Sequence, residues 1–339
     1  MQFKYKFSAV RGIQAGNEYY ISMVPLKILA KLFPDDEEVI LPEYRAQRKI
    51  NEVRIPEIKN YILTNQNSYV FSALSASIDG EFSFKSLSNS DAGFLEINMD
   101  STFLINDGQH RKTAIIEALE EKPEIGDETI SIVFFRDRGL KRSQQMFTDL
   151  NKHAVKTSNS LATLYDSRDE LAKATKMVID KNVFLKKYTD KERDILGKNS
   201  SKLFTLNTIY KANKRILKNS QCDEYDISFL IDYWETVTDN ISEWNELIRK
   251  EISKKELKEN YIVTLSITIQ AFGKLGRLFY ENQDISYKQK LTKLSEIDWS
   301  RDNNQWIGIA IRDNGKVLNG EESINLIYKK IEDLIGLNS

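Results

Sequence analysis

The stretch that decides the fold of this chain is Thr102-Phe-Leu-Ile-Asn-Asp-Gly-Gln-His-Arg111. Its first four residues, Thr102–Ile105, are apolar or β-branched and predict a short strand. The apolar spacing that begins at Ala114 predicts a helix on the other side of Asn-Asp-Gly. Asp107 suits a turn or a cap, and Gly108 permits a positive φ or a close approach of the backbone. The segment therefore predicts a strand, a tight turn and a helix.

This turn has the composition of an anion site. Backbone N–H groups at the start of a helix point outward and attract negative charge. His110 and Arg111 add side-chain donors, and an arginine can hold a phosphate bidentately. The segment lacks the glycines and the lysine of a P-loop, so it predicts a different kind of phosphate cradle. The residues leave a second interpretation open, in which the turn is only capped and Arg111 pairs with a carboxylate.

The rest of the chain falls into two parts. All five prolines precede residue 124, and strand-like segments alternate with helical ones in this first part. The alternation predicts an α/β or α+β domain over 1–160, and apolar periodicity predicts a mostly helical domain over 161–339. The expected strands are 18–23, 69–78, 93–98 and 131–135, with a loop at 12–16 and helices at 25–33 and 51–63. The expected helices of the second part are 160–181, 203–218, 226–251, 255–281 and 322–335.

Composition excludes several classes of protein. The 339 residues carry 49 Lys+Arg and 50 Asp+Glu, a net charge of −1. The single cysteine, Cys222, excludes a disulfide framework and a cysteine-based zinc site. No apolar run is long enough to span a membrane, and the start MQFKYKFSAV lacks the pattern of a signal peptide. We therefore expect a cytoplasmic protein with no membrane partner.

The net charge hides an uneven distribution along the chain. Residues 181–218 hold eleven Lys/Arg against three acids, whereas 219–260 hold eleven acids against five bases. A basic segment of this kind is typical of phosphate-backbone binding and predicts an interface with double-stranded DNA. The alternative is that the two segments pair with each other or form solvated helix faces. The DNA-binding candidates are Lys186, Lys187, Lys198, Lys202, Lys211, Lys214 and Arg215.

Two further features bear on function. The polar segment Phe147–Ser160 contains Asn151, and it overlaps a locally basic region over 136–156. The alternative for its lysines, Lys152 and Lys156, is that they complement the dipole at a helix C-terminus. The four tryptophans are expected in the core or at an interface rather than stacked on bases. They are Trp234, Trp244, Trp299 and Trp306.

Asp107-Gly-Gln-His-Arg-Lys-Thr-Ala114 resembles the signature of the DGQHR-domain family, and in particular of its DndB members, which are associated with DNA sulfur modification (backbone phosphorothioation). Looser similarity covers most of the chain, through 47–62, 149–154, 200–213 and 298–306. The family is similar in turn to the ParB/sulfiredoxin-like fold. The resemblance thus implies an α+β fold, with a ParB-like nucleotide-binding domain followed by a helical domain for DNA or partner binding.

The resemblance also implies roles for individual residues. In ParB-like proteins a Gly-x-x-Arg turn binds nucleotide phosphates, which implies phosphate contacts for Gly108, His110 and Arg111. Asn151 falls near an amide that helps to hold Mg²⁺ on a triphosphate, and Pro42–Arg48 matches an upstream segment that flanks the nucleotide. The candidate nucleotide site is Asp107, Gly108, Gln109, His110, Arg111, Arg48 and Asn151, and Asn151 is also the candidate metal ligand.

Three functions are consistent with these residues. The leading hypothesis is a DndB-like DNA-binding accessory protein that binds ATP and Mg²⁺ and regulates modification, including transcription of the modification genes. The second is an ATPase that energises a DNA-modification complex, with Gln109 as the catalytic residue that positions the attacking water. The third is a scaffold with a degenerate nucleotide pocket. The expected partners are double-stranded DNA, a nucleotide and other DNA-modification proteins.

Overall fold

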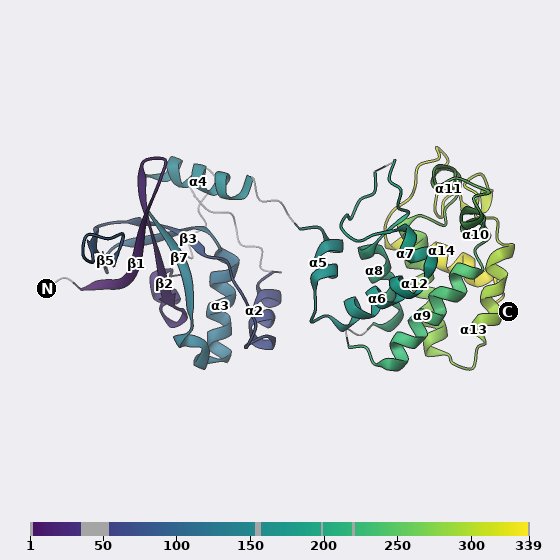
Figure 1. Cartoon of the computed structure of the whole chain (residues 1–339), viewed down its shortest axis with the longest axis horizontal. Coiled ribbons are helices and arrows are strands. Elements are labelled where there is room, and N and C mark those ends of the chain that lie inside the picture. Colours follow the sequence, from purple (N-terminus) through teal and green to yellow (C-terminus); the bar gives the residue numbers. More distant parts are fainter. Residues whose placement is uncertain (1–2, 35–53, 153–156, 198, 219–220, 338–339) are drawn as a thin grey trace. The chain divides into compact units, whose positions relative to one another are not determined.

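The computed structural model describes residues 3–34, 54–152, 157–197, 199–218 and 221–337 (Figure 1). It divides into two compact units, Met1–Val155 and Lys156–Ser339, close to the expected division at residue 160. The first unit combines a sheet with helices, and the second is mostly helical. The chain therefore mixes α and β structure, as the sequence predicted.

A seven-stranded sheet forms the first unit, in the order β4-β5-β1-β2-β7-β3-β6. Neighbouring strands are antiparallel except β3 and β7, which are parallel, so the sheet is mixed. Strand β6 lies at one edge, beside β3. The strands are β1 (Lys4–Gln14), β2 (Asn17–Pro25), β3 (Leu74–Asp79), β4 (Phe82–Ser86), β5 (Ala92–Asn98), β6 (Thr102–Asp107) and β7 (Thr129–Arg136).

Helices cover one apolar face of this sheet. Alternate strand residues, among them Phe7, Val24 and Phe134, form a buried cluster with Ile62 of α2 (Ile55–Thr64) and Ile115 of α3 (Gln109–Glu121). Helices α2 and α3 lie side by side over the sheet (Figure 1). Burial of this apolar surface holds the start of α3 in a fixed place beside β6. The other helical segments are η1 (Leu26–Ile28), α1 (Leu29–Leu32), η4 (Pro123–Asp127) and α4 (Leu140–Lys152).

The second unit packs its helices around a core that contains all four tryptophans, each fully buried, as predicted. Three expected helices, 160–181, 226–251 and 255–281, are each broken in two. One break follows from capping, because the Asp169 side chain accepts a hydrogen bond from Ala172 N and starts a new helix. The helices are α5 (Asn159–Tyr165), α6 (Glu170–Lys181), α7 (Val183–Tyr188), α8 (Leu206–Leu217), α9 (Glu224–Asp239), α10 (Ser242–Arg249), α11 (Lys254–Asn260), α12 (Ser266–Glu281), α13 (Tyr287–Leu291) and α14 (Glu321–Leu334), with η5 (Thr292–Glu296) and η6 (Asn304–Trp306).

A buried polar network fixes the central helices of this unit. Asn213 of α8 donates from Nδ2 to Thr175 Oγ1 of α6 at 3.0 Å, and its Oδ1 accepts from Trp234 Nε1 of α9 at 2.7 Å. Helix α12 approaches α8 at Gly273, where a Cβ would lie 2.6 Å from the Ala212 carbonyl oxygen. Because the buried amide is bonded on both sides and the glycine admits no side chain, the register of α6, α8, α9 and α12 is well determined.

Glu243, in the first turn of α10, is buried, and its Oε2 has no hydrogen-bond partner among the described residues. Burial raises the pKa of this carboxyl to about 7, helped by the charges of Glu246 and Asp298. The folded state therefore holds the proton more tightly than the unfolded chain. This stabilises the fold at low pH, and the contribution is lost as the pH rises through about 7.

We predict that Glu243→Gln gains thermal stability relative to wild type as the pH rises from about 5 to about 8, because the amide never ionises. The measurement is the Tm of both proteins across this range. Parallel curves of Tm against pH would contradict the assignment of a titrating buried carboxyl.

Candidate functional sites

The Asp107–Arg111 segment forms a tight turn between the edge strand and α3. Strand β6 ends at Asp107, and Gly108 caps α3 with φ 103° and ψ 15°. Its carbonyl oxygen accepts the first helical hydrogen bond, from Lys112 N at 2.9 Å. A Cβ on Gly108 would lie 2.4 Å from Leu74 Cδ2. Both reasons for a glycine that the sequence offered, a positive φ and a close approach, are present here.

Arg111 ties this turn to the start of β3. Its Nη2 donates to Asp107 Oδ2 at 2.6 Å, in an ion pair between residues i and i+4. Its Nη1 donates to the carbonyl oxygens of Ser72 and Ala73 at 2.6 and 3.0 Å and to Ser72 Oγ at 2.5 Å. The side chain is 17% exposed. The carboxylate pairing that the sequence left open is thus present, and a phosphate would compete with Asp107 for this guanidinium.

The remaining candidates of the nucleotide site are placed as follows. Gln109 and His110 lie in the first turn of α3 and are partly exposed. Asn151 lies in α4, which packs against β6, the strand that carries Asp107. The structure thus brings the five residues of the turn together and places the helix of Asn151 beside the same strand. Arg48 lies outside the described residues.

Two buried polar side chains beside the turn were missed by sequence reasoning. Asn106 donates from Nδ2 to Ser77 Oγ at 2.9 Å, but its Oδ1 has no partner among the described residues. Ser75 Oγ is likewise buried without a described partner, and Ser75 is the register partner of Asp107 at an irregularity in the β3–β6 ladder. Buried polar atoms without partners are rare in proteins. The available signal was the alternation of serines in Leu74–Asp79.

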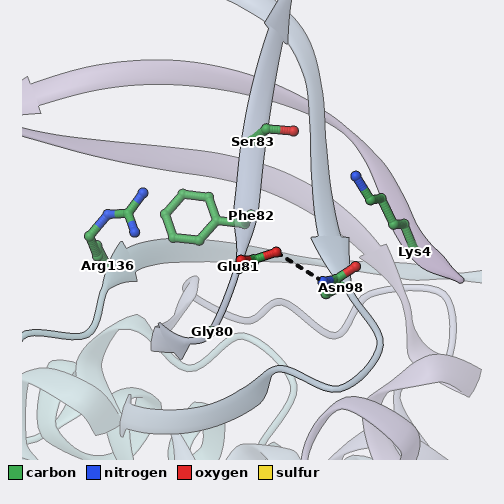
Figure 2. Close-up of a pocket in the computed structure, with 7 residues that line it drawn as sticks. All are labelled: Lys4, Gly80, Glu81, Phe82, Ser83, Asn98 and Arg136. Atoms are coloured by element: carbon green, nitrogen blue, oxygen red, sulfur yellow. Dashed lines mark hydrogen bonds between the residues drawn. The ribbon is translucent and has the colours of Figure 1, made fainter. Parts of the chain in front are cut away.

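A polar hollow of about 280 Å³ lies elsewhere in the first unit (Figure 2). In Figure 2, Arg136 and Lys4 lie on opposite sides of the strand that carries Phe82, with the Arg136 Cζ 4.3 Å from the centre of the Phe82 ring. The hollow is at the Gly80 end of β3, whereas the Asp107 turn is at the Ser75 end. Ser75 and Gly80 are five residue steps apart, roughly 17 Å along an extended strand. The hollow and the turn are therefore separate features.

The basic candidates of the helical unit fall into two groups. Lys186 and Lys187 end α7, and Lys202 joins them because its Nζ donates to the Lys187 carbonyl oxygen at 2.7 Å. Lys211 and Lys214 lie one turn apart on the exposed side of α8. Three bases of 181–218 form ion pairs outside 219–260: Lys191 with Asp180, Arg215 with Glu321 and Lys218 with Glu281.

Arg215 and Lys198 differ from the other candidates. The Arg215 guanidinium forms an ion pair with Glu321 of α14 at 2.6 Å and donates to Gln270 Oε1 at 3.1 and 3.2 Å. It therefore joins α8 to α12 and α14, and a DNA phosphate would have to displace these acceptors. Lys198 lies outside the described residues.

The described residues provide neither a metal-binding cluster nor a membrane-spanning helix. Among the described residues, no group of three His, Cys, Asp or Glu side chains is placed to hold a metal ion. The described helices include none that is long and apolar enough to cross a membrane.

Fold and sites together define a two-unit protein: a mixed-sheet unit with a glycine turn leading into a helix, and a helical unit with a basic surface. A family model described as "DndB: DNA-sulfur modification-associated" matches residues 7–338. The chain belongs to the DndB family, as its DGQHR segment indicated. Membership implies a part in a DNA sulfur modification system, alongside other DNA-modification proteins. Neither a curated protein nor a solved structure matches the chain.

Gly108→Ala tests the geometry of the turn. We predict a loss of about 2–4 kcal/mol in stability, because the new Cβ combines a left-handed backbone with overpacking against Leu74. Gly139→Ala is the matched control, since Gly139 also has a positive φ, 92°, but open space around it. It should lose only about 1 kcal/mol. Equal losses in urea unfolding would show that the close approach to Leu74 is not real.

Proposed function

We propose that the turn at the start of α3 binds the phosphates of a nucleotide, most simply ATP with Mg²⁺, in a ParB-like first domain. The observation that carries the proposal is the geometry of the turn: a glycine with φ 103° opens a thirteen-residue helix at the edge of the sheet. The N–H groups of a first helical turn point out of the helix, and the helix dipole favours an anion there. The backbone at this end of α3 is that of Gly108, Gln109 and His110. Arg111 follows in the same turn and donates to Asp107.

The negative charge of Asp107 beside the turn is the reason for including Mg²⁺ in the proposal. The Asp107 carboxylate is 43% exposed and would repel a triphosphate. Mg²⁺ would relieve that repulsion, and it needs few protein ligands because it keeps several waters. We propose Asn151 as its protein ligand and Arg48 as a further contact to the nucleotide. If the nucleotide is hydrolysed, Gln109 is the residue that we expect to orient the attacking water.

We propose further that the helical unit binds double-stranded DNA and that the protein thereby regulates modification. Support comes from Lys186, Lys187, Lys211 and Lys214, which make no ion pair within the described residues and leave their charge available to phosphates. Lys202 lies beside the first two. The chain belongs to a family associated with DNA sulfur modification, so DNA is the polyanion that we expect these lysines to bind.

Arg111→Ala tests the nucleotide site. We predict that the thermal stabilisation of the wild type by ATP and Mg²⁺ is lost in Arg111→Ala, since a ligand that binds only the folded state must stabilise it. Arg136→Ala is the matched control, because Arg136 lies in the same unit at the separate hollow. Because Arg111 also ties the turn, Arg111→Lys should keep part of the shift. A full shift in Arg111→Ala would contradict the proposal, and steady phosphate release above the Arg111→Ala level would identify an ATPase.

Lys186→Ala/Lys187→Ala tests the DNA surface. If each lysine neutralises one phosphate, the slope of log K against log salt should fall in magnitude by about 2. Lys254→Ala/Lys255→Ala is the matched control, since it removes an exposed lysine pair from α11. The measurement is fluorescence anisotropy with a labelled duplex at several salt concentrations. An unchanged slope in Lys186→Ala/Lys187→Ala would show that these two lysines do not contact DNA phosphates.

A further inference from the structure

The loop between α7 and α8 presents an apolar side chain to solvent. Ile195 is 85% exposed, the highest value among the exposed large hydrophobic residues described. Gly197 lies two residues later, and a Cβ there would have nothing within 4 Å. A single exposed apolar residue is ordinary on a protein surface. The position of Ile195 is informative because of how the loop around it is held.

One side of the loop is fixed to the start of α5. The Asp194 carboxylate accepts four hydrogen bonds there, from N and Nδ2 of Asn159 at 2.7 and 2.8 Å and from N and Oγ of Ser160 at 2.8 and 2.9 Å. The Ser160 hydroxyl shares its one proton between Asp194 and the Arg193 carbonyl oxygen, which lies 2.8 Å from Oγ. Ser158 Oγ donates to the carbonyl oxygen of Glu192. The residues immediately before Ile195 are therefore bonded through side chain and backbone.

The other side of the loop is fixed to α7 and α11. Leu203 N donates to the Tyr188 carbonyl oxygen at 2.8 Å, and the short strands β8 (Thr189–Asp190) and β9 (Phe204–Thr205) pair at the base of the loop. Lys258 Nζ of α11 donates to the Ser200 carbonyl oxygen at 2.7 Å. The described residues on both sides of the tip are thus bonded, and Ile195 directly follows Asp194, which the start of α5 holds. A side chain presented in this way loses little conformational freedom when it enters a partner.

The charges of this loop are mixed, and the bases exceed the acids once the lysines at its base are counted: Lys186, Lys187, Lys191, Arg193 and Lys202 against Asp190, Glu192 and Asp194. Arg193 is exposed two residues before Ile195, and the bond from Lys202 to Lys187 places the α7 lysines at the base of the same loop. The nearby acids Asp190 and Asp194 accept backbone N–H bonds, and Lys191 pairs with Asp180 at 3.0 Å. Glu192 is the exposed carboxylate of the loop. A partner that suits this surface has an anionic exterior and an apolar interior, which is the chemistry of duplex DNA.

We propose that Ile195 is a wedge that enters between stacked base pairs from the minor groove, while Arg193, Lys186 and Lys187 hold the flanking phosphates. Apolar wedges on a cationic surface unstack a base step and kink the duplex. The proposal rests on DNA binding by the helical unit and adds that the protein deforms the DNA. It makes the interface depend on the deformability of the DNA step rather than on hydrogen bonds to bases.

The test compares wild type, Ile195→Ala and the control Val183→Ala, which removes another exposed apolar side chain, 78% exposed, from the start of α7. Each full-length protein is titrated into a duplex with 2-aminopurine at a central step and, separately, into a duplex labelled at both ends for energy transfer. Wild type and Val183→Ala should raise the 2-aminopurine fluorescence and shorten the end-to-end distance. Ile195→Ala should lose both signals and bind about tenfold more weakly, with an unchanged salt slope and an unchanged Tm.

Three results separate the proposals. If wild type binds the duplex and Ile195→Ala deforms it equally well, the wedge is wrong and DNA binding stands. If wild type does not bind DNA even at low salt, the DNA-binding function itself is wrong. If wild type binds without any deformation, and Ile195→Ala instead loses binding to a DNA-modification protein, the tip docks protein and the wedge is again wrong.

Discussion

The guanidinium of Arg111 is the contact on which the candidate nucleotide site depends. It binds acceptors from two places in the chain, Asp107 at the end of β6 and Ser72–Ala73 at the entry to β3. Because it is only 17% exposed, its loss would leave these acceptors without their charged donor. With it in place, β6, the glycine turn and α3 have one arrangement, and the start of the helix lies at the edge of the sheet.

This contact changes how the anion site has to be understood. Arg111 already donates to a carboxylate and two carbonyl oxygens, so its first role is to hold the turn in place. A phosphate bound at the turn would interact with Arg111 mainly through charge. Under the proposed function, the N–H groups at the start of α3 would carry most of the phosphate recognition, and Mg²⁺ would offset the Asp107 charge. Two buried oxygens without a described hydrogen-bond partner, Ser75 Oγ and Asn106 Oδ1, lie on the strands that meet at this turn. Unused hydrogen-bonding groups are therefore concentrated at one end of the β3–β6 pair.

The parts of the fold that follow a local pattern could be predicted from the sequence. Strands β2, β5, β6 and β7 and helix α3 match their apolar spacing, and so does the burial of the tryptophans. Strand β1 was missed although exposed and inward side chains alternate over Lys4–Ala9. A loop was wrongly predicted over 12–14, where Gly12 and the exposed Ile13 interrupt that alternation. The expected strand 69–78 begins only at Leu74, and the residues before it supply the acceptors of Arg111. That partnership spans 39 residues, and no local pattern encodes it.

The central claim is that nucleotide phosphates lie on the N–H groups that open α3. Hydrogen–deuterium exchange of the full-length protein, with and without ATP and Mg²⁺, tests it most directly, because it reports on those amides themselves. The account predicts slower exchange across Gln109–Arg111 with nucleotide present and no change around the Lys4–Arg136 hollow. Unchanged exchange at Gln109–Arg111 under saturating nucleotide, or protection confined to the hollow, would contradict it.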